Sequence, residues 1–236
     1  MATKDHQSEP IESASETLQR IFDGHGSVLG SQMADESSRY DVLKKTDFPK
    51  PKRTRRIAVA NQKGGVGKTT STVNTAAALA NKGAQVLVID MDPQGNASTA
   101  LGVSHASGEP SVYDVIEGRS DLGDVITVCP DFPTLDVVPA SIDLSGAELE
   151  VADLPNRNTL LKEALDLYLR QSDKHYDYVF IDCPPSLGLL VINAMCAVTE
   201  MLIPIQAEYY ALEGLGQLIN TIGLVQEHFN PVLLVS

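Results

Sequence analysis

The 236-residue sequence contains no tryptophan, only three cysteines, and few basic residues outside one short run. The cysteines, Cys129, Cys183 and Cys196, form no CxxC pair and have no metal-ligand spacing, so they do not predict a metal site. No stretch at the N-terminus has the pattern of a secretory signal, and we therefore expect reduced thiols in a cytoplasmic protein. No apolar run reaches the ~18 residues of a membrane-spanning helix.

The few basic residues are unevenly distributed along the chain. The formal net charge is −13, and from Ile57 onward 22 acidic residues stand against 8 basic ones. The one dense basic run consists of Lys50, Lys52, Arg53, Arg55 and Arg56. An acidic body argues against a surface that binds nucleic acid over its whole extent. The basic run is either a solvated linker or an auxiliary contact to DNA phosphates.

Residues 1–55 are predicted to form a largely disordered tail, with residues 50–56 as a basic linker. The tail is rich in Ser, Asp, Glu and Gly and lacks a sustained apolar pattern. One segment at residues 11–22, IESASETLQRIF, places apolar side chains near one side of a helix. This segment is either a transient helix in the tail or a docking helix for a partner.

From residue 56 onward, short apolar segments alternate with helical ones. The predicted strands are Ile57–Asn61, Val86–Asp90, Leu135–Ala140, Tyr178–Asp182, Met201–Ile205 and Val232–Val235. The predicted helices are Gly67–Asn81, Asn158–Leu169, Leu187–Ala197 and Ala211–Glu227. This alternation predicts an α/β fold with a mostly parallel sheet and helices on both faces. Because no helix follows the last strand, we expect residues 56–236 to be a domain truncated at its C-terminus.

A glycine-rich loop, NQKGGVGKTT, stands between the first predicted strand and the first predicted helix. Glycine lets a backbone wrap around an anion, and N–H groups at the start of the following helix point at phosphates. The residues predicted to bind nucleotide here are Lys63, Gly64, Gly65, Val66, Gly67, Lys68, Thr69 and Thr70. Lys68 is expected to reach the β- and γ-phosphates of ATP, and Thr69 to bind Mg²⁺. Position 62 is Gln, where the strict phosphate-loop pattern has glycine.

Three aspartates lie at or just beyond the ends of predicted strands. Asp90 ends one strand, Asp92 follows two residues later, and Asp182 ends another strand. Parallel sheets bind ligands beyond the carboxyl ends of their strands, so we expect the three carboxylates to converge on the phosphate loop. A single aspartate at such a position could instead cap the next helix.

The sequence KGGVGKTT is the deviant Walker A motif. From Ile57 to its end, the chain resembles the ParA/Soj partition ATPases. The resemblance rests on this motif and, in this order, on Asn61-Gln62, DMDPQGNAS, YVFIDCPPSLG and PIQAEYYALEGLGQL. These ATPases belong to the MinD/ParA class of P-loop NTPases. The resemblance implies a Mg²⁺-dependent ATPase of chromosome or plasmid segregation that forms an ATP-dependent sandwich homodimer. It also implies a nucleoid-associated protein that binds DNA nonspecifically, with contacts mostly beyond residue 236, and is stimulated by a ParB-type partner.

The resemblance also implies roles for single residues. Lys63 would cross the dimer interface to the partner's nucleotide, and Asp92 would orient or activate the attacking water, so both are catalytic candidates beside Lys68. Asp182 would act on Mg²⁺ directly or through water, and Asp90 would support the same site. By its spacing from Lys68, Lys63 is expected on the exposed rim of the loop, where it could also be a solvated lysine or bind its own nucleotide.

Other assignments also stay open. Glu208 is a candidate nucleotide contact near the dimer interface, yet a glutamate is also ordinary near the start of a helix. DPQGNAS and CPPSLG would be switch segments that sense the γ-phosphate. An alternative function is a MinD-like membrane-cycling ATPase, which needs an amphipathic C-terminal helix that the sequence does not show. A nitrogenase-reductase-like electron carrier would need cysteines in a different context.

Overall fold

The structure, a computed structural model, describes residues 28–46, 48–206 and 211–236. The chain divides into two compact units, Met1–Phe48 and Pro49–Ser236. Both Glu208 and the candidate docking helix at residues 11–22 lie outside the described residues.

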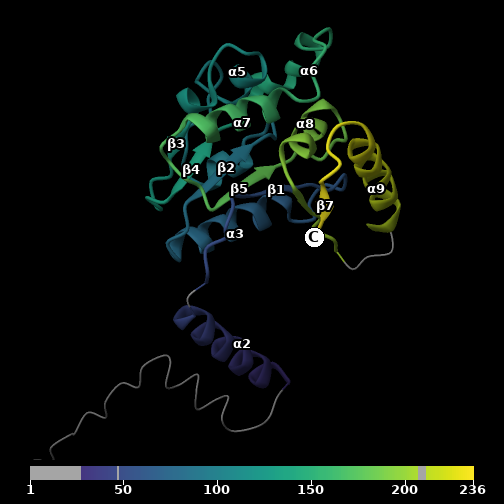
Figure 1. The fold of residues 1–236 in the computed structure, drawn as a ribbon. Helices are drawn as coiled ribbons and strands as arrows, with labels where there is room; N and C mark the ends of the chain where they lie inside the picture. The colour runs from purple at the N-terminus through teal and green to yellow at the C-terminus, as the bar shows by residue number, and fades with distance from the viewer. Residues whose placement is uncertain (1–27, 47, 207–210) are drawn as a thin grey trace, which may run out of the picture. The chain divides into compact units, whose positions relative to one another are not determined.

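The larger unit is built on a seven-stranded sheet with the strand order β3-β4-β2-β5-β1-β6-β7 (Figure 1). The strands are β1 (Arg55–Val59), β2 (Val86–Asp90), β3 (Thr127–Val128), β4 (Leu135–Val138), β5 (Tyr178–Asp182), β6 (Glu200–Leu202) and β7 (Leu234–Val235). Among these, only β3 and β4 pair antiparallel; the other neighbours are parallel. The prediction of a mostly parallel sheet is therefore confirmed.

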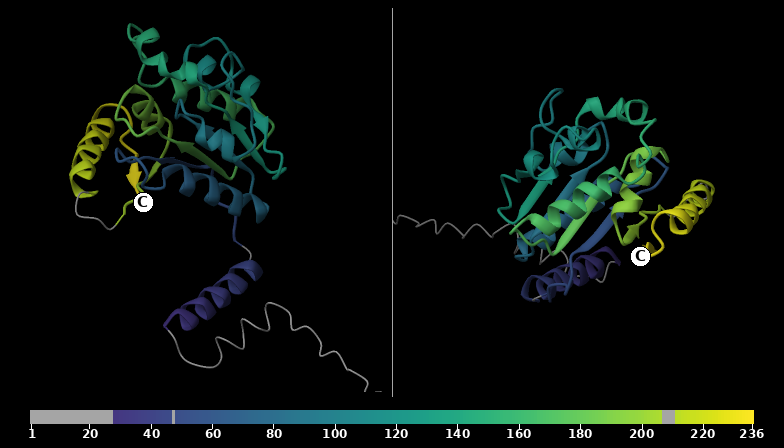
Figure 2. Two further views of the ribbon diagram at one scale, coloured as in Figure 1. Left: turned by 180° about the vertical axis from the view of Figure 1, so that it is seen from behind. Right: turned by 45° about the horizontal axis from the view of Figure 1, so that its top comes forward.

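Helices cover both faces of the sheet, as predicted (Figures 1 and 2). The α-helices of this unit are α3 (Lys68–Asn81), α4 (Asn96–Ala100), α5 (Val112–Ile116), α6 (Ala147–Glu150), α7 (Leu160–Gln171), α8 (Leu189–Ala197) and α9 (Ala211–His228). Two 3₁₀ turns are η1 (Leu122–Val125) and η2 (Ile142–Ser145). α3 packs on one face through buried Ala76 and Ala80, while α5, α7, α8 and α9 contribute to the core on the other face.

The central strands are buried on both faces, which explains their unbroken apolar sequences. Val86, Val88 and Phe180 belong to the core on the α3 side, whereas Leu87 and Ile89 belong to the opposite core. Alternate residues of a strand point to opposite faces, so both sets must be apolar when helices cover both sides. The sequence therefore located β2 and β5 with correct bounds.

The short elements between residues 90 and 158 were not predicted, apart from the strand β4. α4, α5 and α6 have five, five and four residues, and β3 has two. Periodicity cannot be recognised over so few residues, because it needs a window of roughly 11 or more. A helix, α2 (Val28–Lys45), also lies in the stretch predicted to be largely disordered. Residues 31–45 are exposed, whereas most of the stability of protein helices comes from packing an apolar face.

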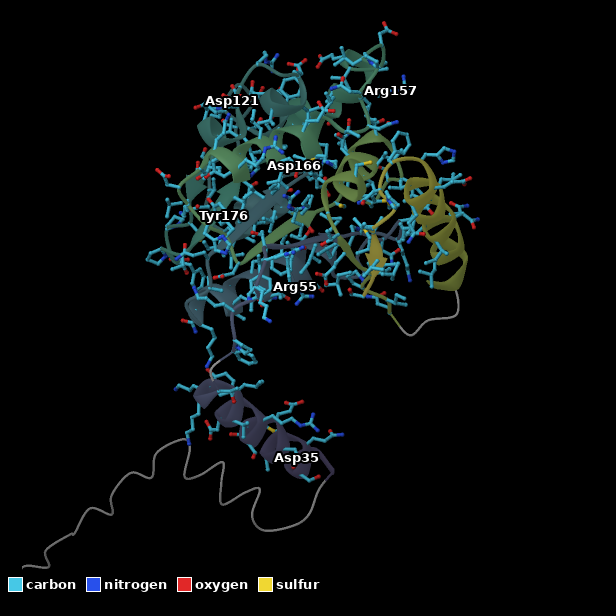
Figure 3. The ribbon with its side chains drawn as sticks, viewed as in Figure 1. Asp35, Arg55, Asp121, Arg157, Asp166 and Tyr176 are labelled. Atoms are coloured by element: carbon cyan, nitrogen blue, oxygen red, sulfur yellow. The ribbon has the colours of Figure 1, made fainter. Side chains whose placement is uncertain are left out.

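The basic run is partly folded into the larger unit. β1 begins at Arg55, inside the predicted linker, and Arg55 pairs with Glu200 at 2.5 Å. Arg56 lies 2.5 Å from Asp166 on α7, and Lys50 lies 3.0 Å from Asp177 (Figure 3 labels Arg55 and Asp166). Three of the five bases are thus paired with acids of the domain.

No helix within residues 28–46, 48–206 and 211–236 has the length and apolar character required to cross a membrane.

Candidate functional site

The predicted phosphate loop connects β1 to α3. Gly65 and Gly67 have left-handed backbones, with φ of +73° and +92°, a conformation in which other residues are strained. α3 begins at Lys68, so its first N–H groups face the loop. The Lys68 side chain is buried, and its Nζ lies 3.4 Å from the Lys63 carbonyl oxygen across the loop. Lys63 itself is half-buried, whereas the sequence predicted an exposed rim position.

Two residues outside the predicted site hold this loop in place. Buried Asn61 accepts a hydrogen bond from the Lys63 N–H at 3.0 Å and donates to the Pro204 carbonyl at 2.8 Å. Gln206 donates from Nε2 to the Gly65 carbonyl at 3.2 Å. The segment after β6 thus contacts the loop at two points, Asn61 and Gly65.

The sheet register brings two of the predicted carboxylates together. β2 and β5 pair so that Asp90 lies opposite Asp182, both fully buried. Asp182 accepts hydrogen bonds from the Thr69 hydroxyl at 2.7 Å and from the Thr72 hydroxyl at 2.9 Å. The carboxyl end of β5 therefore meets the start of α3, as the sequence predicted for the strand-end aspartate Asp182.

The Thr69 and Asp182 oxygens suit a magnesium ion. Neighbouring ligands of an octahedral Mg²⁺ lie about 2.9 Å apart when each is about 2.05 Å from the metal. The observed separation of 2.7 Å between Thr69 Oγ1 and Asp182 Oδ2 is close to that value. Within the described part of the chain, no group of three or more His, Cys, Asp or Glu is arranged for a metal. Mg²⁺ is usually held by one or two carboxylates together with phosphates and water, and Asp182 could supply one such carboxylate.

Burial raises the pKa of Asp182 to about 6. The hydrogen bonds from Thr69 and Thr72 act in the opposite direction, and the nearby carboxylates of Asp90 and Asp92 raise the pKa further. The charges of Asp90 and Asp92 thus disfavour the ionised form of Asp182, and a bound cation would favour it.

Asp90 is bonded to the loop that follows β2. Its Oδ2 accepts hydrogen bonds from the N–H and the hydroxyl of Ser98, both at 2.8 Å, and its Oδ1 accepts from the Asp92 N–H at 3.1 Å. Burial raises the pKa of Asp90 despite these bonds. Asp90 therefore holds the 92–98 loop in place; its predicted support of the nucleotide site stays a prediction.

Asp92 lies at the start of the same loop and is 8% exposed. Its Oδ1 accepts a hydrogen bond from the Gln94 N–H at 3.0 Å. Because Asp90 binds the backbone of Asp92, the two strand-end acids are positioned together. The structure thus brings Asp90, Asp92 and Asp182 to the sheet edge where the phosphate loop lies.

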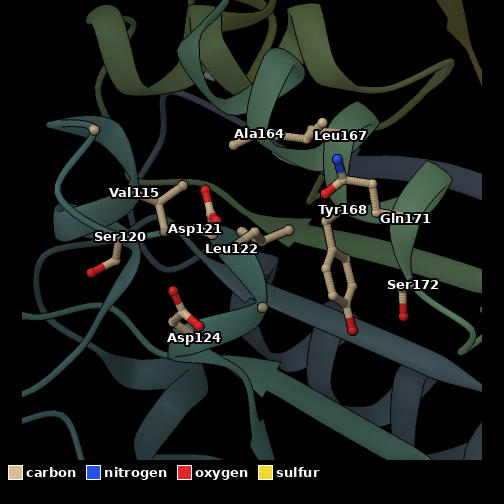
Figure 4. A pocket seen from close by; sticks show the side chains of 12 residues that line it. Val115, Ser120, Asp121, Leu122, Asp124, Ala164, Leu167, Tyr168, Gln171 and Ser172 are labelled. Atoms are coloured by element: carbon tan, nitrogen blue, oxygen red, sulfur yellow. The ribbon is translucent and has the colours of Figure 1, made fainter.

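A surface cavity of about 390 Å³ lies elsewhere, between η1 and α7 (Figure 4). It shares no residue with the phosphate loop. Its lining includes the carboxylates of Asp121 and Asp124 and the ring of Tyr168, but no lysine or arginine. A pocket with acids and no cation does not suit a nucleotide's phosphates, so the cavity is not a second candidate for the ATP site.

The comparisons with known proteins agree with this geometry. Residues 54–235 match a family model described as an AAA domain. The chain is 51% identical over 180 residues to the sporulation initiation inhibitor protein Soj of Bacillus subtilis. It is 47% identical over 180 residues to the chromosome partitioning protein ParA of Caulobacter vibrioides. Each match covers 76% of this chain, and 69% and 66% of the respective relative.

The chain belongs to the ParA/Soj family of partitioning ATPases. A solved structure, described as cobyrinic acid a,c-diamide synthase from Mycobacterium smegmatis with bound ADP and magnesium, has the same fold. It is 40% identical, has a TM-score of 0.71, and the match covers 77% of this chain and 72% of that one. The ParA/Soj assignment made from the motifs is confirmed. The nitrogenase-reductase-like alternative would need cysteines that bind a cluster between two subunits, whereas the three cysteines of this chain are buried.

Sequence reasoning missed several residues of this ParA/Soj site. Thr72 and Ser98 bond the aspartates, Gln206 bonds the loop, and His105 packs against Gly95 in the DPQGN segment. Each is a common polar residue whose partner is distant in sequence or whose spacing is not part of a known pattern. Gln206, inside the quoted PIQAEYYALEGLGQL motif, and Ser98, at the end of DMDPQGNAS, had a sequence signal that could have been used.

Replacing Gly95 with alanine is expected to destabilise the domain by about 2–3 kcal/mol, more than an alanine at Gly83. Both glycines are left-handed, with φ of +63° and +80°. A Cβ at Gly95 would lie 2.4 Å from His105 Nδ1, whereas one at Gly83 would meet nothing within 4 Å. Denaturant unfolding of both variants checks this. Equal losses would contradict it, and adding His105→Ala to Gly95→Ala should recover the difference.

Proposed function

We propose that this chain is a Mg²⁺-dependent ATPase that acts in chromosome or plasmid segregation. The observation that carries the proposal is the meeting of Thr69, Asp182 and the left-handed turn of the phosphate loop at one sheet edge. The bound ADP and magnesium named for the solved relative support it.

Each residue of the site has a defined part in this proposal. The loop N–H groups and Lys68 would bind the phosphates, and Thr69 and Asp182 would hold the metal. Bound Mg²⁺ would neutralise charge on the phosphate oxygens. Asp92, fixed by its own contacts with Asp90 and Gln94, would orient the attacking water.

Lys63 would complete the site of a second protomer in an ATP-dependent sandwich homodimer. Its backbone is held by Asn61, so the side chain starts from a defined position next to the phosphate loop. A second cation at the phosphates would stabilise charge that develops during transfer, as an arginine finger does. Hydrolysis would then require dimerisation, and a ParB-type partner would stimulate it.

Replacing Asp92 with asparagine is expected to lower ATP hydrolysis about 100-fold while ATP binding changes little. Asparagine keeps the size of the side chain but loses the carboxylate that would act on the water. Phosphate release measured with ATP and Mg²⁺ checks this, with Asp131→Asn, at an exposed position, as the matched control. Wild-type hydrolysis without any added acceptor would distinguish an ATPase from an ATP-consuming synthase. Full activity in Asp92→Asn would remove Asp92 from the mechanism.

Nonspecific DNA binding by residues 1–236 is expected to be weak. Lys50, Arg55 and Arg56 are already paired with acids, and several phosphate contacts are needed for tight, salt-dependent binding. In this proposal the protein is cytoplasmic and nucleoid-associated. Tight, salt-sensitive retention of DNA by this chain in a filter-binding assay with ATP would contradict the expectation.

The alternative is a MinD-like membrane-cycling ATPase. The 51% identity to Soj and 47% identity to ParA favour partitioning over this alternative. Flotation with liposomes in the presence of ATP would separate the two, since a partitioning ATPase should stay in the unbound fraction.

A further inference from the structure

Thr72 is fully buried on α3, one turn after Thr69, and the phosphate-loop motif does not include it. Its hydroxyl lies 2.9 Å from Asp182 Oδ1 and 3.1 Å from the Lys68 carbonyl oxygen. A hydroxyl has one proton to donate, and an ionised carboxylate is a stronger acceptor than a carbonyl. We therefore assign the proton of the Thr72 hydroxyl to the hydrogen bond with Asp182 Oδ1.

The two threonines donate hydrogen bonds to different oxygens of the Asp182 carboxylate. Thr69 donates to Oδ2 and Thr72 to Oδ1, from adjacent turns of the same helix. The terminal torsion of an aspartate is broad, so a single hydrogen bond leaves the carboxylate plane able to turn. Two donors on two different oxygens fix that plane and direct Oδ2 toward the hydroxyl of Thr69.

We propose that Thr72 is a positioning residue for the magnesium site, holding Asp182 so that its Oδ2 and the Thr69 hydroxyl face one ion. The inference rests on the proposed Mg²⁺-dependent function. Groups that orient metal ligands without touching the metal typically change metal affinity 10–100-fold when they are removed. Thr72 meets that description because it bonds Oδ1 of the ligand Asp182, the oxygen that Thr69 does not bond.

Thr72→Val tests this directly, because valine has nearly the same shape but cannot donate a hydrogen bond. The full chain is titrated with Mg²⁺ at a fixed concentration of a fluorescent ATP analogue. The Mg²⁺ midpoint is expected to rise about 10-fold or more. Affinity for the analogue in EDTA should change less than about twofold, since the loop and Lys68 are untouched. Thr72→Ser keeps the hydroxyl and should restore the wild-type midpoint.

Thr75→Val is the matched control. It makes the same chemical change on the same helix at an exposed position, and it should leave both the Mg²⁺ midpoint and nucleotide affinity unchanged. Unfolding of all variants is measured in parallel. If Thr72→Val does not fold, Thr72→Ala takes its place with the same titration.

An unmoved Mg²⁺ midpoint in Thr72→Val or Thr72→Ala, with or without a loss of stability, would overturn the assignment and leave Thr72 a packing residue. A wild-type chain that binds the ATP analogue identically with and without Mg²⁺ would contradict the proposed function as well. These two failures are distinguishable, because only the second is seen in the wild type.

Discussion

Lys68→Ala is expected to weaken ATP binding about 100-fold, the loss of a charge-assisted contact to the phosphates. The side chain is buried at the start of α3 and reaches back over the loop to the Lys63 carbonyl. The Lys68→Ala variant keeps the backbone N–H groups of the loop, but α3 no longer supplies a cation to the phosphates. Titration of a fluorescent ATP analogue measures the change, and an affinity within about threefold of wild type would contradict the assignment.

Lys63→Ala, in the same experiment, should behave differently. ATP affinity is expected to stay within about threefold of wild type, while the ATP-dependent dimer is lost in analytical ultracentrifugation. The reason is that Lys63 is proposed to act on the partner's nucleotide, whereas Lys68 acts on its own. Lys82→Ala, at an exposed lysine beyond the other end of α3, removes the same charge and serves as the control. A dimer of normal stability in Lys63→Ala would exclude the proposed action across the interface.

Asp182→Asn is expected to stabilise the nucleotide-free protein. It is also expected to abolish the contribution of Mg²⁺ to nucleotide binding. Burial raises the pKa of Asp182 to about 6, so keeping it ionised at neutral pH costs folding free energy. A shift of about two pKa units corresponds to about 3 kcal/mol at pH 7.5, or about 6–12 °C in Tm for a domain of this size. Asparagine can keep hydrogen bonds with both Thr69 and Thr72, so little is lost in exchange.

The pH dependence of this gain has a defined sign. A carboxyl whose folded pKa is raised contributes stability that is fully present below its unfolded pKa and is lost as pH rises through about 6. The advantage of Asp182→Asn should therefore be largest above pH 6 and fall to about half at pH 5. Denaturant unfolding at the two pH values measures it. If the variant is less stable than wild type at pH 7.5, the ionised Asp182 carboxylate does not destabilise the fold and the expectation is wrong.

Asp177→Asn is the matched control, because the same change should have the opposite sign there. Burial would raise the pKa of Asp177, but the Gln85 N–H and the Lys50 ammonium outweigh it and lower the pKa. Its ionised form therefore stabilises the fold, and asparagine should destabilise it at pH 7.5. Equal effects at the two positions would point to a general response to lost charge.

The strands predicted with correct bounds were those whose environment is uniform. β2 and β5 are covered on both faces, so their sequences are continuously apolar and end at an aspartate. β1 was shifted by two residues because its first residues, Arg55 and Arg56, are charged. Those residues are tolerated in a strand since Glu200 and Asp166 pair with them, and neither partner is near in sequence.

The sequence by itself determined the phosphate loop and the ends of the strands that carry the aspartates. Glycine's backbone freedom and the apolar character of a buried strand are local properties, and each is visible in a few consecutive residues. Only the tertiary structure decided the partners of those aspartates. Thr72 meets Asp182 across 110 residues, because the parallel register of β5 brings the two together, and no local pattern encodes that distance.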